Sequence, residues 1–288
     1  MARAVIFGSR GMLGAELVRA FRDYELFTPS GRELDITDEH AVRDYLFSRR
    51  PDLIINAAAY NFVDAAETPE GYLKAMAVNG LAPGHLAKFA RLLGVPLVHY
   101  STDQVFGHEE RAGFTEAHPP GPGPRLSAYA RSKLLGEKLL SAGTDKFYII
   151  RTSRLFGERG ESLGAKKSFV DVFLERAGEA LVIPAVSDEI AGATYAPDLA
   201  RATRDLVIDG VPWGYYHLTN HGAASWYDLA HTVVALGRKG AIVRPVSRDA
   251  FARPAWRPRF SLLLNTKRPR LRPWQEALEE YFAKKKKS

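Results

Sequence analysis

The chain has 288 residues, 46% of them apolar and 25% charged, so it can bury a large core in one big domain or two moderate ones. The absence of cysteine excludes disulfides, thiolate metal sites and cysteine nucleophiles, and it is typical of a soluble cytoplasmic protein. Of the formal net charge of +7, Lys284 to Lys287 contribute four. We interpret this basic balance as a solvated tail and not as a nucleic-acid surface, an anionic partner for the tail being the less favoured alternative. Neither a membrane-spanning run nor a signal peptide is predicted.

A short apolar run, a glycine-rich turn and a helical pattern open the chain in that order. Residues 2–7 predict a strand, and a helix is expected over residues 15–21. Between them, Gly8 suits a tight turn, Gly11 lets the backbone approach a pyrophosphate, and Gly14 lets the helix pack close to the sheet. The helix N-terminus would face the anion with free N–H groups. This context indicates dinucleotide binding, with a glycine-rich loop of an unrelated α/β protein as the alternative.

A second strand over residues 26–28 precedes the position where dinucleotide folds read the adenosine half of the cofactor. A carboxylate directly after this strand usually accepts from the ribose 2′-OH, whereas nearby arginines favour a 2′-phosphate. Arg10 lies inside the glycine turn and Arg32 follows the strand, while Asp35 comes later than an NAD-selecting acid would. The pattern favours NADP(H) and leaves NAD(H) open. Solvated surface side chains are the alternative for both arginines.

Polar residues follow two further predicted strands. Residues 52–56 predict a strand covered on both faces, and the alanines at 57–59 leave room for a ligand at its end. Residues 97–103 predict a fourth strand that ends in Thr102 and Asp103. Because ligands of open α/β sheets bind at the carboxyl ends of the strands, these two side chains lie where chemistry is expected.

Tyr129 and Lys133 lie four residues apart at the start of a predicted helix, after a loop rich in Gly and Pro over residues 107–124. This spacing places both on one helix face. Lowering a phenol pKa from ~10 to about 7 needs roughly 4 kcal/mol, and one cation at about 4–5 Å supplies most of that. The spacing alone is weak evidence, since Tyr281 and Lys285 share it. The preceding sheet makes proton transfer to a carbonyl the favoured interpretation over a plain amphipathic helix face.

The later chain has a looser pattern, which predicts a smaller domain over the same edge of the sheet. We expect a doubly wound α/β parallel sheet of the Rossmann type over residues 1–160. Residues 161–288 would mainly form a smaller C-terminal α/β substrate domain, with some segments returning to the first. Further expected elements are a helix over 68–93, a strand over 147–152, a helix from 196, a strand over 214–218 and a helix over 226–236 capped by Ser225. His217 and His221 lie at a strand end and turn, so no metal site is predicted.

The motifs together resemble the dTDP-4-dehydrorhamnose reductase family, within the extended short-chain dehydrogenase/reductase superfamily, over essentially the whole chain. In the first half they are the glycines of 8–14, Leu34–Asp38, Asn56–Tyr60, Val63–Asp64, Ala66–Glu67, His99–Asp103, Tyr129 with Lys133, and Arg151–Ser153. In the second half they are Thr194–Ala196, Tyr216–Asn220, Ser225–Tyr227 and Arg257–Pro258.

The resemblance implies reduction by NAD(P)H of the C4 ketone of a nucleotide-linked 6-deoxy sugar, in this family dTDP-4-dehydro-L-rhamnose. It implies a catalytic triad of Thr102, Tyr129 and Lys133, in which Tyr129 gives a proton to the developing alkoxide. Lys133 would hold the nicotinamide ribose and stabilise the phenolate, and Thr102 would donate a hydrogen bond to the oxygen that becomes the alkoxide.

The expected cofactor-binding residues are Gly8, Ser9, Arg10, Gly11, Met12, Leu13, Gly14, Arg32, Asp35, Ile36, Ala57, Ala58, Ala59, Tyr129 and Lys133. The expected substrate-binding residues are Val63, Thr102, Asp103, Gln104, Arg154 and Arg257.

Departures from the family pattern concentrate where the sugar is expected. Gln104 replaces a common Tyr, Arg154 a Trp, Ser168 an Asn, and Phe260 another Asn. At position 154 the aromatic ring that would pack against the sugar is replaced by an arginine, a cation with five hydrogen-bond donors. The substrate could therefore be a sugar with a more polar or charged substituent. Reduction of a different nucleotide 4-keto sugar, and a non-catalytic dinucleotide-binding regulatory subunit, are the alternatives. We expect a monomer or homodimer with a nucleotide-sugar substrate, no nucleic-acid or membrane partner, and no divalent metal.

Overall fold

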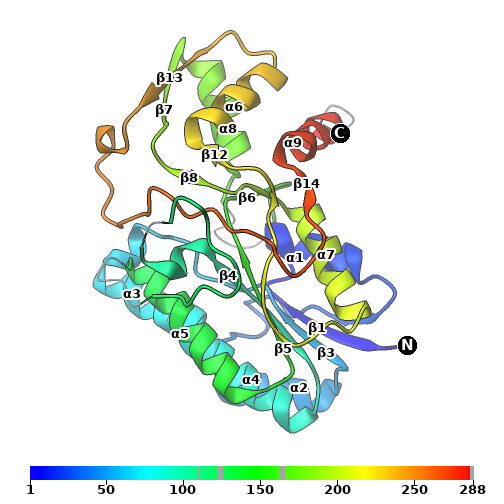
Figure 1. Ribbon diagram of the computed structural model, residues 1–288. Coiled ribbons are helices and arrows are strands. Elements are labelled where there is room, and N and C mark those ends of the chain that lie inside the picture. Colours follow the sequence, from blue (N-terminus) through cyan, green and yellow to red (C-terminus); the bar gives the residue numbers. More distant parts are fainter. Residues whose placement is uncertain (109, 122–125, 162–165, 286–288) are drawn as a thin grey trace.

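A parallel sheet of six strands forms the centre of the fold (Figure 1). The computed structural model describes residues 1–108, 110–121, 126–161 and 166–285, so Lys286, Lys287 and residues 109 and 122–124 of the predicted loop lie outside the described residues. The strand order is β10, β5, β4, β3, β1, β2, with every neighbouring pair parallel. The strands are β1 (Arg3–Phe7), β2 (Glu25–Phe27), β3 (Leu53–Asn56), β4 (Leu97–Thr102), β5 (Phe147–Thr152) and β10 (Gly214–His217).

The sheet is covered on both faces because its strands alternate two apolar sets. Ala4 and Ile6 of β1 pack into one core cluster, whereas Val5 and Phe7 pack into the other. The first face carries α1 (Met12–Ala20) and α7 (Ala196–Ile208). The second carries α2 (Glu39–Arg49), α4 (Ala82–Leu93) and α5 (Ala128–Gly143). This is the doubly wound arrangement that the sequence predicts.

The predicted helix over residues 68–93 contains a π-helical turn that the sequence pattern did not indicate. It comprises α3 (Pro69–Ala75), the π turn η2 (Met76–Leu81) and α4, and it ends at Gly94, which has φ +72°. The π turn directs Asn79 towards its neighbours: its Oδ1 accepts from the Tyr60 N–H at 2.9 Å, and its Nδ2 donates to the Tyr60 carbonyl at 3.0 Å and to Ser132 Oγ at 3.1 Å. Asn79 therefore joins the segment after β3 to the helix of Tyr129.

A smaller body with its own apolar cluster lies over the carboxyl ends of the strands (Figure 1). Its helices are α6 (Phe169–Glu179), α8 (Trp226–Leu236) and α9 (Trp274–Lys285). Its short strands are β6 (Leu155–Phe156), β7 (Val182–Val186), β8 (Ile190–Ala191), β9 (Thr194–Tyr195), β11 (Asn220–His221), β12 (Ala224–Ser225), β13 (Ile242–Val246) and β14 (Leu271–Pro273). The 3-10 turns in the described part of the chain are η1 (Ala65–Glu67), η3 (Asp103–Phe106) and η4 (Arg248–Ala250). The chain crosses back between the bodies, because β10 and α7 belong to the central sheet layer.

Two further observations concern what the described residues do not contain. No helix among them combines the length and apolar character needed to cross a membrane. Within the same ranges, no group of three or more His, Cys, Asp or Glu side chains could hold a metal ion.

Candidate active site

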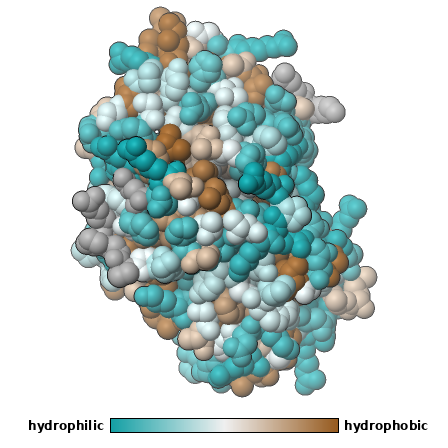
Figure 2. Space-filling view, in the orientation of Figure 1, coloured by the Kyte–Doolittle hydropathy of each residue, from teal (hydrophilic) through white to brown (hydrophobic). Residues whose placement is uncertain are grey.

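A cavity of about 570 Å³ lies between the carboxyl ends of the strands and the smaller body. In Figure 2, apolar residues gather in the upper middle of the face shown, with hydrophilic residues on either side. The cavity walls come from segments far apart in the sequence: the glycine turn, the ends of β3 and β4, the start of α5, and the small-body segments around β6, α6, β8 and α8. Such a cavity is large enough for a small-molecule site.

The turn between β1 and α1 requires glycine at two positions. Gly8 has φ +74°, and a Cβ there would lie 2.5 Å from the Ala58 nitrogen; a Cβ on Gly14 would lie 2.0 Å from the Gly8 oxygen. Gly11 caps α1, with its N–H donating to the Gly8 carbonyl at 2.9 Å. The helix N-terminus thus borders the cavity, through Gly11 to Gly14. This fits a dinucleotide pyrophosphate.

Thr102, Tyr129 and Lys133 meet at the cavity as the triad requires. Ser127 caps α5, its Oγ accepting from the Ala130 N–H at 3.2 Å, so Tyr129 falls in the first turn of the helix. The Tyr129 hydroxyl is hydrogen-bonded to Thr102. Lys133 Nζ donates to the Tyr100 backbone carbonyl at 3.0 Å. One helix and one strand end therefore hold all three groups.

Burial raises the pKa of Tyr129, whereas the sequence analysis considered how a nearby cation would lower it. Removal from water, and next the charge of Asp103, raise the pKa of Tyr129, while the hydrogen bond with Thr102 lowers it only in part. Burial also lowers the pKa of Lys133 to about 8, against the attraction of Glu137. The expected fall of the Tyr129 pKa towards 7 is wrong for this structure. A protonated phenol at neutral pH is nevertheless the form that a reductase needs.

Asp103 lines the cavity but is almost fully buried, and its carboxylate is engaged by neighbouring hydroxyls. It is 6% exposed, and its carboxylate accepts from Thr102 Oγ1 at 3.0 Å, Ser153 Oγ at 3.0 Å and Ser261 Oγ at 2.6 Å. Burial raises its pKa, and the three hydroxyls and Arg154 oppose that rise. The Thr102 hydroxyl is thus hydrogen-bonded both to the Asp103 carboxylate and to the Tyr129 hydroxyl.

The remaining predicted substrate contacts, Val63, Gln104, Arg154 and Arg257, also line the cavity. Arg257 forms a two-pronged ion pair with Asp64, at 2.7 and 3.0 Å. Gln104 places its side-chain oxygen in a buried position where no hydrogen-bond partner lies among the described residues. A buried, unpaired acceptor of this kind favours a ligand that brings a donor.

The other two departures from the family pattern have local roles. Ser168 caps α6, and its Oγ accepts from the Asp171 N–H at 3.3 Å. The ring of Phe260 lies 5.1 Å from the guanidinium carbon of Arg111.

The predicted cofactor residues divide into two groups. Those at the cavity are Gly11, Met12, Leu13, Gly14, Ala57, Ala59, Tyr129 and Lys133. Those outside its lining are Gly8, Ser9, Arg10, Arg32, Asp35, Ile36 and Ala58. Arg10, Arg32 and Asp35 are exposed, and the Asp35 carboxylate accepts from the backbone N–H and hydroxyl of Thr37. Ile36 is buried in the core, so its role towards an adenine stays a prediction.

Sequence reasoning missed most of the wall formed by the smaller body. Glu189, Phe169 and Trp226 line the cavity, as does Gly160, whose Cβ would lie 2.4 Å from the Arg10 oxygen. Trp226 stood next to the predicted helix cap at Ser225, but nothing in the pattern linked it to the strand ends. Glu189 and Gly160 carried no sequence signal.

Residues 2–287 match the sequence profile described as RmlD substrate binding domain. The chain belongs to this RmlD family. It is 38% identical to a dTDP-4-dehydrorhamnose reductase of Streptomyces griseus, over 97% of this chain and 93% of that protein. It is 36% identical to a dTDP-4-keto-6-deoxy-D-glucose reductase of Streptomyces niveus, over 91% of this chain and 88% of that protein. The resemblance drawn from the motifs is confirmed.

The RmlD-family chain also matches solved structures along its length. It superposes on a dTDP-4-dehydrorhamnose reductase of Bacillus anthracis in complex with NADP with a TM-score of 0.90 at 30% identity, covering 99% of this chain and 100% of that one. The predicted fold class, a Rossmann-type sheet of the extended short-chain dehydrogenase/reductase kind, is confirmed.

Proposed function

We propose that the protein is an NAD(P)H-dependent reductase that converts the C4 ketone of a nucleotide-linked 4-keto-6-deoxy sugar to an alcohol, with dTDP-4-dehydro-L-rhamnose as the favoured substrate. The convergence of Thr102, Tyr129 and Lys133 with the glycine turn on one cavity carries this proposal. The names of the Streptomyces relatives add the dTDP-linked keto sugar. We propose NADP(H) as the preferred cofactor, supported by the NADP complex of the Bacillus anthracis relative.

The chain's own residues would divide the chemistry as follows. The bound nicotinamide cofactor supplies the hydride, and the glycine turn and the end of β3 would hold it. Tyr129 holds the proton that the carbonyl oxygen needs once it becomes an alkoxide. The charge of Lys133 stabilises the phenolate left on Tyr129, an effect that a buried site strengthens. Thr102, fixed by Asp103, orients the phenol through the hydrogen bond between them.

A different nucleotide 4-keto sugar is the second candidate substrate. Two observations favour keeping it: a relative that is 36% identical is named for dTDP-4-keto-6-deoxy-D-glucose, and Gln104 and Arg154 replace aromatic residues at the cavity. The third reading, a regulatory subunit without turnover, gives no chemical reason for the phenol, hydroxyl and ammonium to share a cavity. It predicts cofactor binding that Tyr129→Phe leaves unchanged, and no oxidation of cofactor with any keto sugar.

The deciding experiment measures oxidation of NADPH and of NADH by purified protein mixed with dTDP-4-keto-6-deoxy-L-mannose, prepared in situ from dTDP-glucose. Rapid oxidation supports the rhamnose-pathway reductase and gives the cofactor preference. Cofactor binding without oxidation, followed by turnover of another dTDP-4-keto sugar, moves the assignment to the second candidate. We also propose a cytoplasmic location and a monomer or homodimer, for which light scattering during gel filtration gives the mass.

A further inference from the structure

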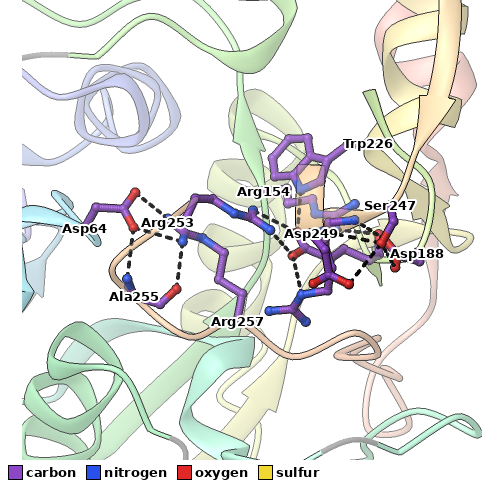
Figure 3. A network of polar contacts seen from close by, with 11 residues as sticks. Asp64, Arg154, Asp188, Trp226, Ser247, Asp249, Arg253, Ala255 and Arg257 are labelled. Carbon is purple, nitrogen blue, oxygen red and sulfur yellow. Dashed lines mark hydrogen bonds and ion pairs between the residues drawn. The ribbon is translucent and has the colours of Figure 1, made fainter. Parts of the chain in front are cut away.

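Arg154, which stands where the family commonly has a Trp, is held by three contacts at the cavity wall. Its two terminal nitrogens donate to the Ala224 carbonyl at 2.7 Å and the Glu189 carbonyl at 2.9 Å. Its guanidinium carbon lies 4.2 Å from the ring centre of Trp226, a cation over an aromatic face. Its backbone adopts φ +40°, a left-handed conformation that the surrounding contacts must maintain. Figure 3 shows the Arg154 side chain directly beside the indole.

The charge of Arg154 is already balanced inside the protein. Burial lowers its pKa to about 10, so it stays charged at neutral pH, and Asp103 and then Glu189 are the carboxylates that oppose the shift most. Asp103 lies on the side of the triad, and Glu189 on the side of the smaller body. These carboxylates compensate the buried charge of Arg154, so no ligand anion is needed to stabilise it.

Trp226 is also held in place by contacts with its neighbours. Its N–H donates to Glu189 Oε2 at 3.2 Å, and its ring meets Phe169 edge to face at 5.8 Å. Ser225, the residue before it, forms a capping box with Asp228 that sets the start of α8. The indole is half-buried, with Arg154 over one ring face, and it lines the cavity, so part of its surface is open to a ligand there.

Glu189 contacts Trp226, Arg154 and Arg253 and so connects the residues of this cavity wall. It is 2% exposed, and its carboxylate receives the Trp226 N–H, both terminal nitrogens of Arg253, and Arg248 at 3.6 Å. Its backbone carbonyl receives Arg154. Glu189 thereby connects Trp226 to Arg253, two of the residues labelled in Figure 3. The network fixes Trp226 and Arg154 as one unit.

We propose that Trp226 supplies the aromatic surface against which the sugar ring of the substrate packs, and that Arg154 is a positioning residue that holds this ring instead of reading a charged substituent. The inference rests on the proposed function. Apolar faces of a sugar ring pack against an aromatic side chain, which a cavity wall of this kind offers. The aromatic surface missing at position 154 is thus provided from α8, and specificity for an uncharged 6-deoxy sugar is retained.

The test compares Trp226→Leu, Arg154→Met and Arg154→Lys with the unmodified protein. Trp213→Leu is the matched control, because Trp213 packs on Tyr148 away from the cavity and is 44% exposed. The readouts are KM and kcat for the dTDP-4-keto-6-deoxy sugar, the NADPH dissociation constant, and the melting temperature. A contact that holds the substrate equally in the ground and transition states changes KM and leaves kcat.

We expect Trp226→Leu to raise KM by about tenfold or more, with NADPH affinity and kcat within about twofold. Arg154→Met should raise KM by a similar factor, and Arg154→Lys should recover part of it, because lysine keeps a cation over the indole but cannot span both carbonyls with a planar fork. Trp213→Leu should leave every constant unchanged. A variant that fails to melt cooperatively is replaced by Trp226→Phe, which keeps the ring but removes the N–H to Glu189.

Two results would overturn the inference: a KM within twofold of the unmodified protein in Trp226→Leu, or a selective loss in Arg154→Met of a substrate that bears a carboxylate. Failure of the proposed function is visible separately, as an unmodified protein that oxidises no NADPH with any keto sugar. In that event, binding of dTDP-L-rhamnose to the NADP-saturated protein decides the inference. Weaker binding to Trp226→Leu than to Trp213→Leu supports it, and equal or absent binding overturns it.

Discussion

Thr102 donates its hydroxyl proton to the buried carboxylate of Asp103 at 3.0 Å. The Thr102 hydroxyl is also hydrogen-bonded to Tyr129, so that carboxylate, hydroxyl and phenol form one connected chain at the cavity. The carboxylate also receives Ser153 and Ser261, so one group organises three hydroxyls under the site.

Asp103→Asn should separate activity from stability. Burial raises the pKa of Asp103, so the folded protein binds this proton more tightly than the unfolded chain does. As pH rises through the raised pKa, the carboxyl ionises inside the protein and the free energy of unfolding falls. Asparagine removes the charge and keeps the shape, so we expect an unchanged or higher melting temperature at pH 7. Because Thr102 then loses its charged hydrogen-bond partner and is held less firmly against Tyr129, kcat should fall by about tenfold. Thermal melting and steady-state rates measured on one preparation check this, and a large drop in melting temperature would contradict it.

Tyr129→Phe should lower kcat by roughly two orders of magnitude or more, the usual effect of losing a positioned acid, with NADPH affinity retained. Tyr281→Phe is the matched control. Tyr281 also precedes a lysine by four residues, but its hydroxyl donates to Asp171 at 3.0 Å in the smaller body. Its loss should cost about 1 kcal/mol of stability and leave kcat unchanged. Near-normal reduction by Tyr129→Phe would remove the phenol from its assigned role.

The rate should decline as pH rises through about 8, because the pKa of Lys133 is lowered to about 8 and the phenolate then loses its cation. The sign for stability is opposite: a lysine whose folded pKa lies below its unfolded value of ~10.4 destabilises the protein below pH 8, and this cost disappears as pH rises towards 10. A profile of kcat/KM against pH from 6 to 10 checks the first effect. In Lys133→Met the rate should be low throughout, without a decline near pH 8.

Gly14→Ala should damage both the fold and cofactor binding, since the new Cβ would lie 2.0 Å from the Gly8 oxygen and force the turn apart. We expect a loss of about 1–3 kcal/mol in the free energy of unfolding and at least tenfold weaker NADPH binding. Gly31→Ala is the control, because an added Cβ there meets no heavy atom within 4 Å in the described part of the chain. Urea unfolding and calorimetric titration measure the two effects, and equal behaviour of the two variants would refute the steric argument.

Local sequence patterns predicted those parts of the site that local chemistry determines. The strand, turn and helix around Gly8 to Gly14 and the helix start at Ser127 follow from short-range rules, and the structure has them. The cluster of hydroxyls on Asp103 could not be predicted, because Ser153 and Ser261 reach that carboxylate only after the chain has folded.

The wall of the smaller body was unpredictable for the same physical reason. Glu189 and Trp226 are 37 residues apart in sequence and become partners through tertiary packing. Arg154 shows what a residue considered alone leaves undetermined: its five donors predict a substrate contact, and the fold adds that two backbone carbonyls and an indole contact the guanidinium of a side chain that also lines the cavity. The π turn at Asn79 likewise lacked a local signal, because its helix has an ordinary pattern on either side.

The π turn fixes the rotational phase between α3 and α4. A π turn holds one more residue than an α-helical turn, and each residue of an α-helix advances the side chains by about 100°. Deleting one residue from Met76–Leu81 would restore a regular helix but swing Asn79 about a quarter of a circle away from Tyr60 and Ser132. The length of this turn therefore sets how α5, which carries Tyr129, lies against the segment after β3, and a change of one residue in that length would separate the two.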